Sequence, residues 1–403
     1  MNRLEEMYDK VLEQMDMGHE MEDEELLELI HMVINDVSRE KYMPLEEKIR
    51  LSKELFNAFR KLDILQDLIE DEDVTEIMIN GTDNIFLEKN GRVCQSDKHF
   101  LSVNKLEDVI QQIVAGTNRY VNESSPIVDA RLEDGSRVNV VLKPVALNGP
   151  IMTIRKFPKE KVTMEQLISW GSISLEGAEF LEMLVCAKYN IFVSGGTGAG
   201  KTTFLNALSD YIPKDERLIT IEDNAELQIK GVQNLVRLET RNANLEGEGA
   251  VTIRELIKSA LRMRPDRIVV GEVRGEETVD MISSAMLNGH SGSMSTGHAN
   301  NTVDMLRRLE TMMMMGIDMP LTAIQRQVAS AIDIIIHLGR LRDKSRKVLE
   351  IAEVLGYENG VIQVQTLYEY REEGMEHGKI QGNLVKVEEL IHKEKLLAAG
   401  YKD

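Results

Sequence analysis

The sequence has 403 residues, with 48 basic and 68 acidic side chains and a formal net charge of −20. This length leaves room for two or three domains with separate cores, and the composition does not indicate disorder. The acidic balance disfavours a nucleic-acid machine, because an acidic surface repels the phosphate backbone unless the basic residues cluster.

Cysteine content and hydropathy indicate the compartment. The two cysteines, Cys94 and Cys186, form no CxxC motif and no disulfide framework, which is typical of a reducing environment. No apolar run reaches the roughly 18 residues of a membrane span, and the start lacks a signal-peptide pattern. We therefore expect a cytoplasmic protein that meets a membrane only peripherally.

The first 62 residues are acidic and have a helical pattern. One face of the first predicted helix collects apolar side chains, namely Leu4, Met7, Val11, Leu12 and Met15. Two interpretations stay open for residues 1–62, a solvated helical extension and an arm that docks a partner.

Residues 63–157 predict a small α/β domain. Alternating or apolar runs at 74–80, 84–91 and 137–145 read as strands, and the turn signals Asn80-Gly81 and Asn90-Gly91 end the first two. A helical pattern at 105–116 lies between them. Residues 158–175 mix proline, glycine, serine and charge without a period, which predicts a linker.

A second domain is expected over residues 176–366. The apolar runs NIFVSG, LITIED, RIVVGE and DIIIHLG alternate with helix-length segments, which is typical of a doubly wound sheet. One such segment, 252–265, has Thr252 and Glu255 spaced as a capping box and Pro265 as a stop. Residues 367–403 predict a charged tail that turns helical at 385–400.

The run GGTGAGKTT fits the phosphate-loop pattern G-x-x-x-x-G-K-[ST] between a predicted strand and a predicted helix. Glycines let consecutive backbone N–H groups turn toward phosphates, Lys201 reaches the β and γ phosphates, and the Thr202 hydroxyl ligates magnesium. We expect ATP and Mg²⁺ to bind through Gly195, Gly196, Thr197, Gly198, Ala199, Gly200, Lys201, Thr202 and Thr203.

The run RIVVGEVRG resembles the strand that ends in a magnesium-side aspartate in many phosphate-loop enzymes, but Gly271 occupies that position. Three other carboxylates follow apolar strands, Glu222 and Asp223 after LITI and Glu272 after IVVG. At the carboxyl edge of a parallel sheet, one acid can hold magnesium through water while another polarises the attacking water. The alternative is that these acids cap the next segment or face solvent.

The stretch NGHSGSMSTGHANN carries His290 and His298. A metal site would need more ligands nearby than this segment offers. A histidine that senses the γ phosphate and an ordinary loop histidine both remain open.

These ordered motifs, GGTGAGKTT, TIEDNAEL, RLETRNANLEGEG, LRMRPDRIVVGEVRGEE and GHSGSMSTGHAN, resemble the secretion ATPase superfamily of type II and type IV systems. The similarity is closest to the CpaF family of tight-adherence pili and spans residues 65–366. It implies a RecA-like phosphate-loop core, a smaller PAS-like α/β domain before it and ATP hydrolysis. It also implies a homohexamer that works with inner-membrane pilus platform proteins, at the cytoplasmic face of the membrane and without nucleic acid.

The resemblance carries roles residue by residue. Glu222 and Glu272 match the hydrolytic acids, with Glu222 also a magnesium ligand and Asp223 beside the nucleotide, and His298 matches the histidine box. Arg137 in DGSRVN and Arg155 in MTIRKF match arginines of the N-terminal domain that approach the phosphates.

The chain also departs from the family patterns. It lacks the paired CxxC insertion of the type II branch, and residues 1–62 match no motif. A nucleic-acid translocase and a nucleotide-gated scaffold with little turnover remain as rival functions.

Overall fold

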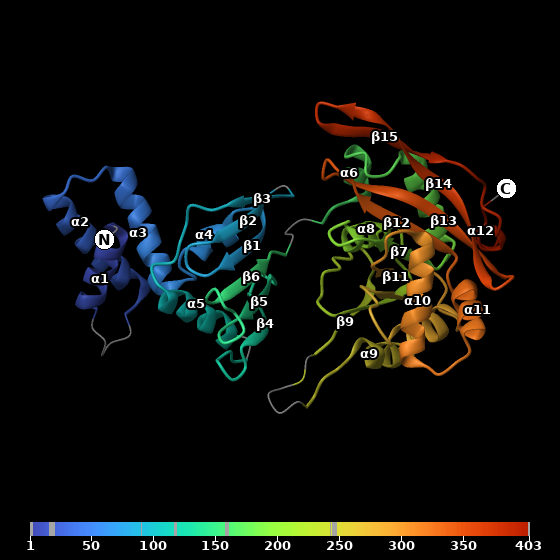
Figure 1. Ribbon diagram of the computed structural model, residues 1–403, viewed down its shortest axis with the longest axis horizontal. Coiled ribbons are helices and arrows are strands. Elements are labelled where there is room, and N and C mark those ends of the chain that lie inside the picture. The colour runs from blue at the N-terminus through green and yellow to red at the C-terminus, as the bar shows by residue number, and fades with distance from the viewer. Residues whose placement is uncertain are drawn as a thin grey trace. The chain divides into compact units, whose positions relative to one another are not determined.

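The computed structural model describes residues 3–15, 21–89, 91–116, 119–157, 161–241, 243 and 248–401. The chain divides into two compact units, Met1–Lys159 and Glu160–Asp403 (Figure 1). Each unit is built around its own sheet, six-stranded in the first and nine-stranded in the second.

The first unit begins with three helices, α1 (Arg3–Gln14), α2 (Asp23–Glu40) and α3 (Leu45–Arg60). Their apolar faces form a core of their own, in which Met7 and Val11 of α1 are fully buried. Leu12, expected on the same face, is 45% exposed, so the buried stripe is narrower than the sequence predicts. The predicted helical extension is thus a packed helical cluster.

The remainder of this unit is a sheet of order β3-β2-β1-β6-β5-β4, with helices α4 (Leu65–Glu70) and α5 (Val103–Ala115). Alternate strand residues such as Ile77 and Ile79 point into a core shared with α5, so one face of the sheet is buried. The strands are β1 (Val74–Asn80), β2 (Ile85–Lys89), β3 (Arg92–Gln95), β4 (Ile127–Arg131), β5 (Arg137–Val141) and β6 (Ile151–Arg155).

The sheet of the second unit has the order β15-β14-β13-β12-β7-β11-β10-β8-β9. Its parallel part comprises β7 (Ile191–Gly195), β8 (Arg217–Glu222), β9 (Asn234–Glu239), β10 (Arg267–Val270), β11 (Met294–Gly297) and β12 (Ile334–Arg340). An antiparallel extension follows, β13 (Arg346–Glu358), β14 (Val361–Glu376) and β15 (Lys379–Lys386). The parallel order brings the carboxyl ends of β7, β11, β10 and β8 to one edge.

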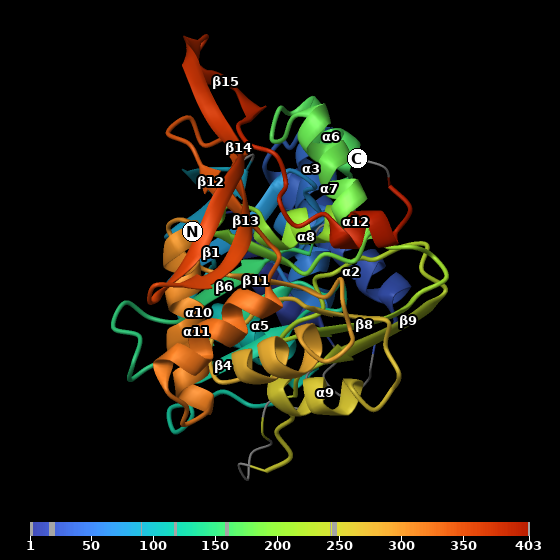
Figure 2. The ribbon, with the colours of Figure 1, turned by 90° about the vertical axis from the view of Figure 1, so that its right-hand side faces the viewer.

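Helices cover both faces of this sheet (Figure 2). Each face has its own core of buried side chains. On one face lie α6 (Met164–Ser169), α7 (Leu175–Cys186), α8 (Lys201–Ser209) and the short α12 (Glu394–Ala398). On the other lie α9 (Ile253–Ala260), the π-helix η1 (Asp280–Met286), α10 (Thr302–Gly316) and α11 (Leu321–Ala331). Among the described residues, no helix has the length and hydropathy needed to cross a membrane.

Several expectations for single elements are wrong. The segment predicted as a linker, 158–175, contains α6 and the first residue of α7. The boundary placed after residue 366 falls inside β14, and the helix expected over 385–400 is confined to α12. The Thr252–Glu255 capping box is confirmed, but α9 ends at Ala260, well before Pro265.

Candidate nucleotide site

The phosphate loop connects β7 to α8, and its glycines are required by geometry. Gly198 and Gly200 have φ angles of 70° and 92°, a left-handed conformation that disfavours residues with a Cβ. At Gly195 a Cβ would lie 2.6 Å from the Leu338 carbonyl oxygen of the neighbouring strand. Around Gly196, by contrast, a Cβ would meet no atom within 4 Å. The loop is therefore tightly packed at its first residue, Gly195, and open at Gly196, which we call the crown of the loop.

Lys201 begins α8 directly after this loop, and only 7% of the residue is exposed. Its ammonium group donates to the Gly196 carbonyl over 3.2 Å and lies 3.2 Å from Nδ1 of His298. The side chain therefore curls back over the loop, and its charge sits where phosphates would bind.

His298 follows β11, the strand that lies between β7 and β10 in the sheet. Its Nε2 lies 3.1 Å from Oε1 of Glu272, which follows β10, so one ring bridges Lys201 and Glu272. Burial lowers the pKa of His298, and the Lys201 charge lowers it further, which favours the neutral ring. The predicted histidine and one predicted acid thus meet at the phosphate loop.

Glu272 also has a charged neighbour, Arg274. Arg274 Nη2 donates to Glu272 Oε2 over 2.9 Å, and Arg274 Nη1 lies 3.9 Å from Asp223 Oδ2. Among the described residues, the buried Oε1 of Glu272 has no hydrogen-bond partner, since its approach to His298 lacks hydrogen-bond geometry. Sequence reasoning missed Arg274, although it stands two residues after Glu272 in the same motif.

Glu222 ends β8 and occupies a different setting. It is 3% exposed, and its Oε1 accepts from the backbone N–H groups of Glu226 and Leu227 at 2.9 and 2.8 Å. Burial raises its pKa to about 7, against the lowering effect of those two bonds. Glu222 thus supports the loop that follows it, as the capping alternative proposed, while its pKa suits proton transfer near neutral pH.

The two predicted arginines belong to the first unit. Arg137 of β5 and Arg155 of β6 are direct partners in the sheet register, and Arg131 of β4 is in turn the partner of Arg137. Their strand neighbours Val138 and Ile154 point into the core, so the arginines line the opposite face. This row of three cations, of which Arg131 was not predicted, could bind a polyanion.

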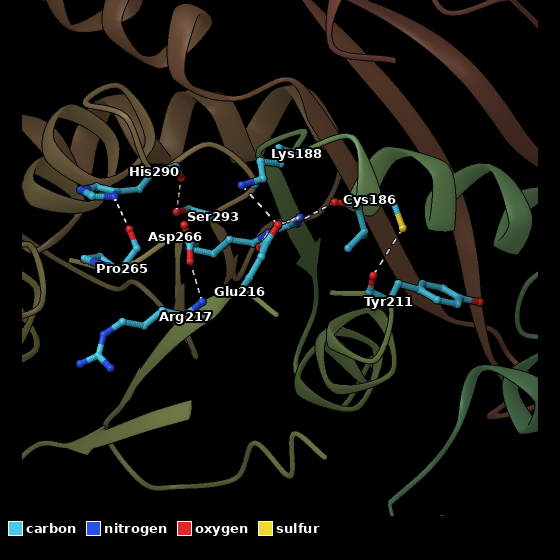
Figure 3. Close-up of polar contacts among 12 residues, drawn as sticks. Cys186, Lys188, Tyr211, Glu216, Arg217, Pro265, Asp266, His290 and Ser293 are labelled. Carbon is cyan, nitrogen blue, oxygen red and sulfur yellow. Dashed lines mark hydrogen bonds and ion pairs between the residues drawn. The ribbon is translucent and has the colours of Figure 1, made fainter. Parts of the chain in front are cut away.

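The other histidine of the predicted loop, His290, lies away from His298. The strand β11 separates them, and His290 Nδ1 lies 3.0 Å from the Pro265 carbonyl oxygen (Figure 3). The two rings do not share a site.

Magnesium fits the residues beside the loop. Mg²⁺ bound with a nucleotide takes few protein ligands, because phosphates and water supply most of its oxygens. Of the two predicted ligands, Thr202 and Glu222, the Oε1 of Glu222 already accepts from two backbone N–H groups. The Thr202 hydroxyl and the Glu272 Oε1, which has no hydrogen-bond partner among the described residues, are the groups that could hold the ion directly or through water. Among the described residues, no cluster of three or more His, Cys, Asp or Glu side chains forms a metal site.

A pocket of about 440 Å³ opens beside the loop crown. It is lined by Gly196, Thr197, His298, Ala299, Asn300, Asp304 and Arg308. The loop backbone at Gly196 and Thr197 and the Arg308 guanidinium on its wall are suited to phosphate groups, while Asp304 adds one negative charge.

The chain is similar to several proteins of secretion systems. The putative conjugal transfer protein Rv3659c of Mycobacterium tuberculosis is 34% identical over 311 residues, 76% of this chain and 87% of that protein. The type IV secretion system protein PtlH of Bordetella pertussis is 30% identical over 317 residues, 72% of this chain and 93% of that protein. The solved structure of the Legionella pneumophila ATPase DotB has a TM-score of 0.52 at 21% identity, covering 73% of this chain and 80% of that one.

The fold similarity agrees with the expected architecture, a RecA-like core after a smaller α/β domain. The family model described as Type II/IV secretion system protein matches residues 59–398. The chain therefore belongs to the type II/IV secretion system protein family.

Proposed function

We propose that this protein hydrolyses ATP as a homohexameric motor that drives assembly of a tight-adherence pilus through an inner-membrane platform. One observation carries the ATPase part, the meeting of Lys201, His298 and Glu272 beside the open crown of the phosphate loop. Family membership supports a role as a secretion-system motor. The pilus assignment rests on the resemblance of the ordered motifs.

Each residue has a role in this proposal. The loop N–H groups and Lys201 bind the phosphates and offset their charge. Glu272 orients the attacking water and accepts its proton, and the His298 ring lies between Glu272 and Lys201. Thr202 would hold the Mg²⁺ that binds with ATP, and that ion would supply positive charge against the β and γ phosphates.

Arg137 and Arg155 would act on a bound nucleotide from the α/β domain of the first unit. Their direct pairing across β5 and β6 places both arginines on one face of the sheet, which supports a joint role on one anion. Domain closure over nucleotide, repeated around a ring, is how we propose that hydrolysis becomes mechanical work.

The ring proposal is tested by light scattering of the purified chain with and without a non-hydrolysable ATP analogue. ATPase activity per milligram is measured over the same protein concentrations. We expect an assembly of about six chains, in keeping with closed ring symmetry, and a specific activity that rises with it. A monomer with flat specific activity would contradict the ring.

A second candidate is a motor for a conjugation system. It is favoured by Rv3659c, which is named as a putative conjugal transfer protein. The net charge of −20 disfavours direct contact with DNA. Stimulation of the ATPase by single-stranded DNA would favour this candidate, and no response would favour the pilus motor.

A further inference from the structure

A basic hairpin lies against the phosphate loop within the second unit. It joins β12 to β13, and five of its eight residues from 340 to 347 are lysine or arginine. Two of them flank its base, since Arg340 and Arg346 are direct partners in the sheet register. In a chain of net charge −20, such a cluster is a local exception that attracts anions.

Arg346 makes a specific contact with the loop. Its Nε donates to the Gly198 carbonyl oxygen over 2.8 Å, and a Cβ on Gly200 would lie 3.4 Å from its Cδ. Arg340 stands on the same side, with Nη1 4.0 Å from the position of a Cβ on Gly198. The two left-handed glycines of the loop thus face the base of the hairpin.

The direction of this bond defines what Arg346 can do. In a phosphate loop the N–H groups point inward at the ligand, so the carbonyl groups point outward. The Arg346 donor on the Gly198 carbonyl fixes the orientation of the Gly198–Ala199 peptide unit, whose N–H donates to the Gly196 carbonyl over 3.3 Å, and so helps to hold the turn of the loop. The guanidinium charge also adds favourable potential for an anion on the other side of the loop.

The hairpin itself is held in place. Asp343 accepts from the backbone N–H and the hydroxyl of Ser345, and also from the Ile380 N–H of β15 at 2.8 Å. The Leu341 N–H donates to the Ser345 carbonyl over 2.8 Å, which closes the turn. Arg346 therefore projects from a fixed base, which is what a positioning group requires.

We propose that Arg346 is a positioning residue of the nucleotide site, which holds the phosphate loop in its binding conformation from the β12–β13 hairpin. This inference rests on the proposed nucleotide site and adds a residue that the sequence motifs do not contain. Arg340, directly opposite, adds charge.

The same hairpin supplies a matched control. Arg342 forms an ion pair with Glu372 through both terminal nitrogens, one of them 2.8 Å from Glu372 Oε2. Replacing it removes the same charge from the same hairpin without removing the contact to Gly198. Both arginines are exposed, so neither substitution opens a cavity.

The test measures binding of mant-ADP with magnesium, and steady-state kinetics with ATP, in the full chain. We expect Arg346→Ala to weaken mant-ADP binding and raise the KM for ATP by about tenfold, with kcat changed less than about twofold. Arg346→Lys keeps a charged donor and should recover most of the affinity, and Arg342→Ala should match the wild type. Unfolding temperatures without nucleotide should be the same for all four proteins.

Two outcomes overturn the inference alone. One is an affinity of Arg346→Ala for mant-ADP equal to that of the wild type. The other is a loss of affinity in Arg342→Ala as large as that in Arg346→Ala, which would show that the charge of the hairpin, and not the contact with Gly198, causes the effect. Absence of mant-ADP binding by the wild type itself would instead overturn the proposed function, and this inference with it.

Discussion

The Glu222 side chain lies in the space next to Gly271, where other phosphate-loop enzymes carry an aspartate. A Cβ on Gly271 would lie 3.1 Å from Glu222 Cγ and 3.5 Å from its Oε1. The adjacent strands β8 and β10 are in register there, because the Gly271 N–H donates to the Ile221 carbonyl over 2.9 Å. The Glu222 side chain thus occupies the space that a side chain at position 271 would fill.

This relationship predicts that Gly271→Ala is destabilising by about 1–3 kcal/mol, the usual cost of overpacking a filled core site. Combining it with Glu222→Ala should remove most of that cost, because the clash partner is gone. Thermal unfolding of the two single variants and the double variant measures the coupling. If the destabilisation of the double variant equals the sum of the two single variants, the side chains at positions 222 and 271 do not compete for the same space.

The raised pKa of Glu222 predicts a pH-dependent stability. The folded protein keeps this carboxyl protonated up to about pH 7, while the unfolded chain releases the proton near the ordinary value of 4.5. The folded state therefore binds more protons between these values, and stability falls as pH rises through that window.

The variant Glu222→Gln lacks this titration and provides the comparison. We expect the free energy of unfolding of Glu222→Gln, relative to that of the wild type, to rise from about pH 5 and to level off above pH 7. The total change is on the order of 3 kcal/mol, and the unfolding temperature should follow it. The measurement is thermal unfolding across this range. A difference independent of pH would show that Glu222 is ionised in the folded protein throughout.

His298 should affect turnover more than binding. Its ring bridges Lys201 and Glu272, so His298→Ala leaves the phosphate loop intact but releases both partners. We expect kcat to fall about 10- to 100-fold with a smaller change in mant-ADP affinity. His290→Ala is the matched control, since that ring faces the Pro265 carbonyl at the other end of β11. Equal kinetics in the two variants would remove His298 from the site.

The edge of the sheet away from the nucleotide site depends on a buried ion pair. Arg267 is fully buried, contacts both Glu216 oxygens and donates to the Val185 carbonyl over 2.6 Å. Arg267→Met leaves a buried carboxylate, which should destabilise the fold by about 3–5 kcal/mol. The double variant with Glu216→Leu should recover much of this loss in thermal unfolding. No recovery would mean that packing, not charge, dominates the site.

The central strands and the phosphate loop could be predicted because their signals are local. Apolar runs bounded by turns gave β7, β8, β10 and β12, and the glycine spacing placed Lys201 correctly at the start of a helix. The short strand β11 was missed, because its residues, Met-Ser-Thr-Gly, resemble a loop and are buried only by the strands on either side.

The contacts within the site could not be predicted from the sequence, because they depend on the order of the strands in the sheet. Only the insertion of β11 between β7 and β10 brings His298 to both Lys201 and Glu272. The antiparallel strands β14 and β15 were not predicted, for a different reason. They are half exposed and rich in charge, so their sequence resembles a solvated tail, and pairing with β13 decides their structure.

The most direct test of the account is the steady-state rate of phosphate release from ATP by wild type, Lys201→Ala and Glu272→Gln, with exposed Glu388→Gln as the control. We predict that Lys201→Ala loses both nucleotide binding and turnover. Glu272→Gln should still bind ATP but hydrolyse it at least about 100-fold more slowly than the wild type. Glu388→Gln should equal the wild type. A wild-type rate no higher than that of Glu272→Gln would contradict the ATPase assignment and favour a nucleotide-gated scaffold.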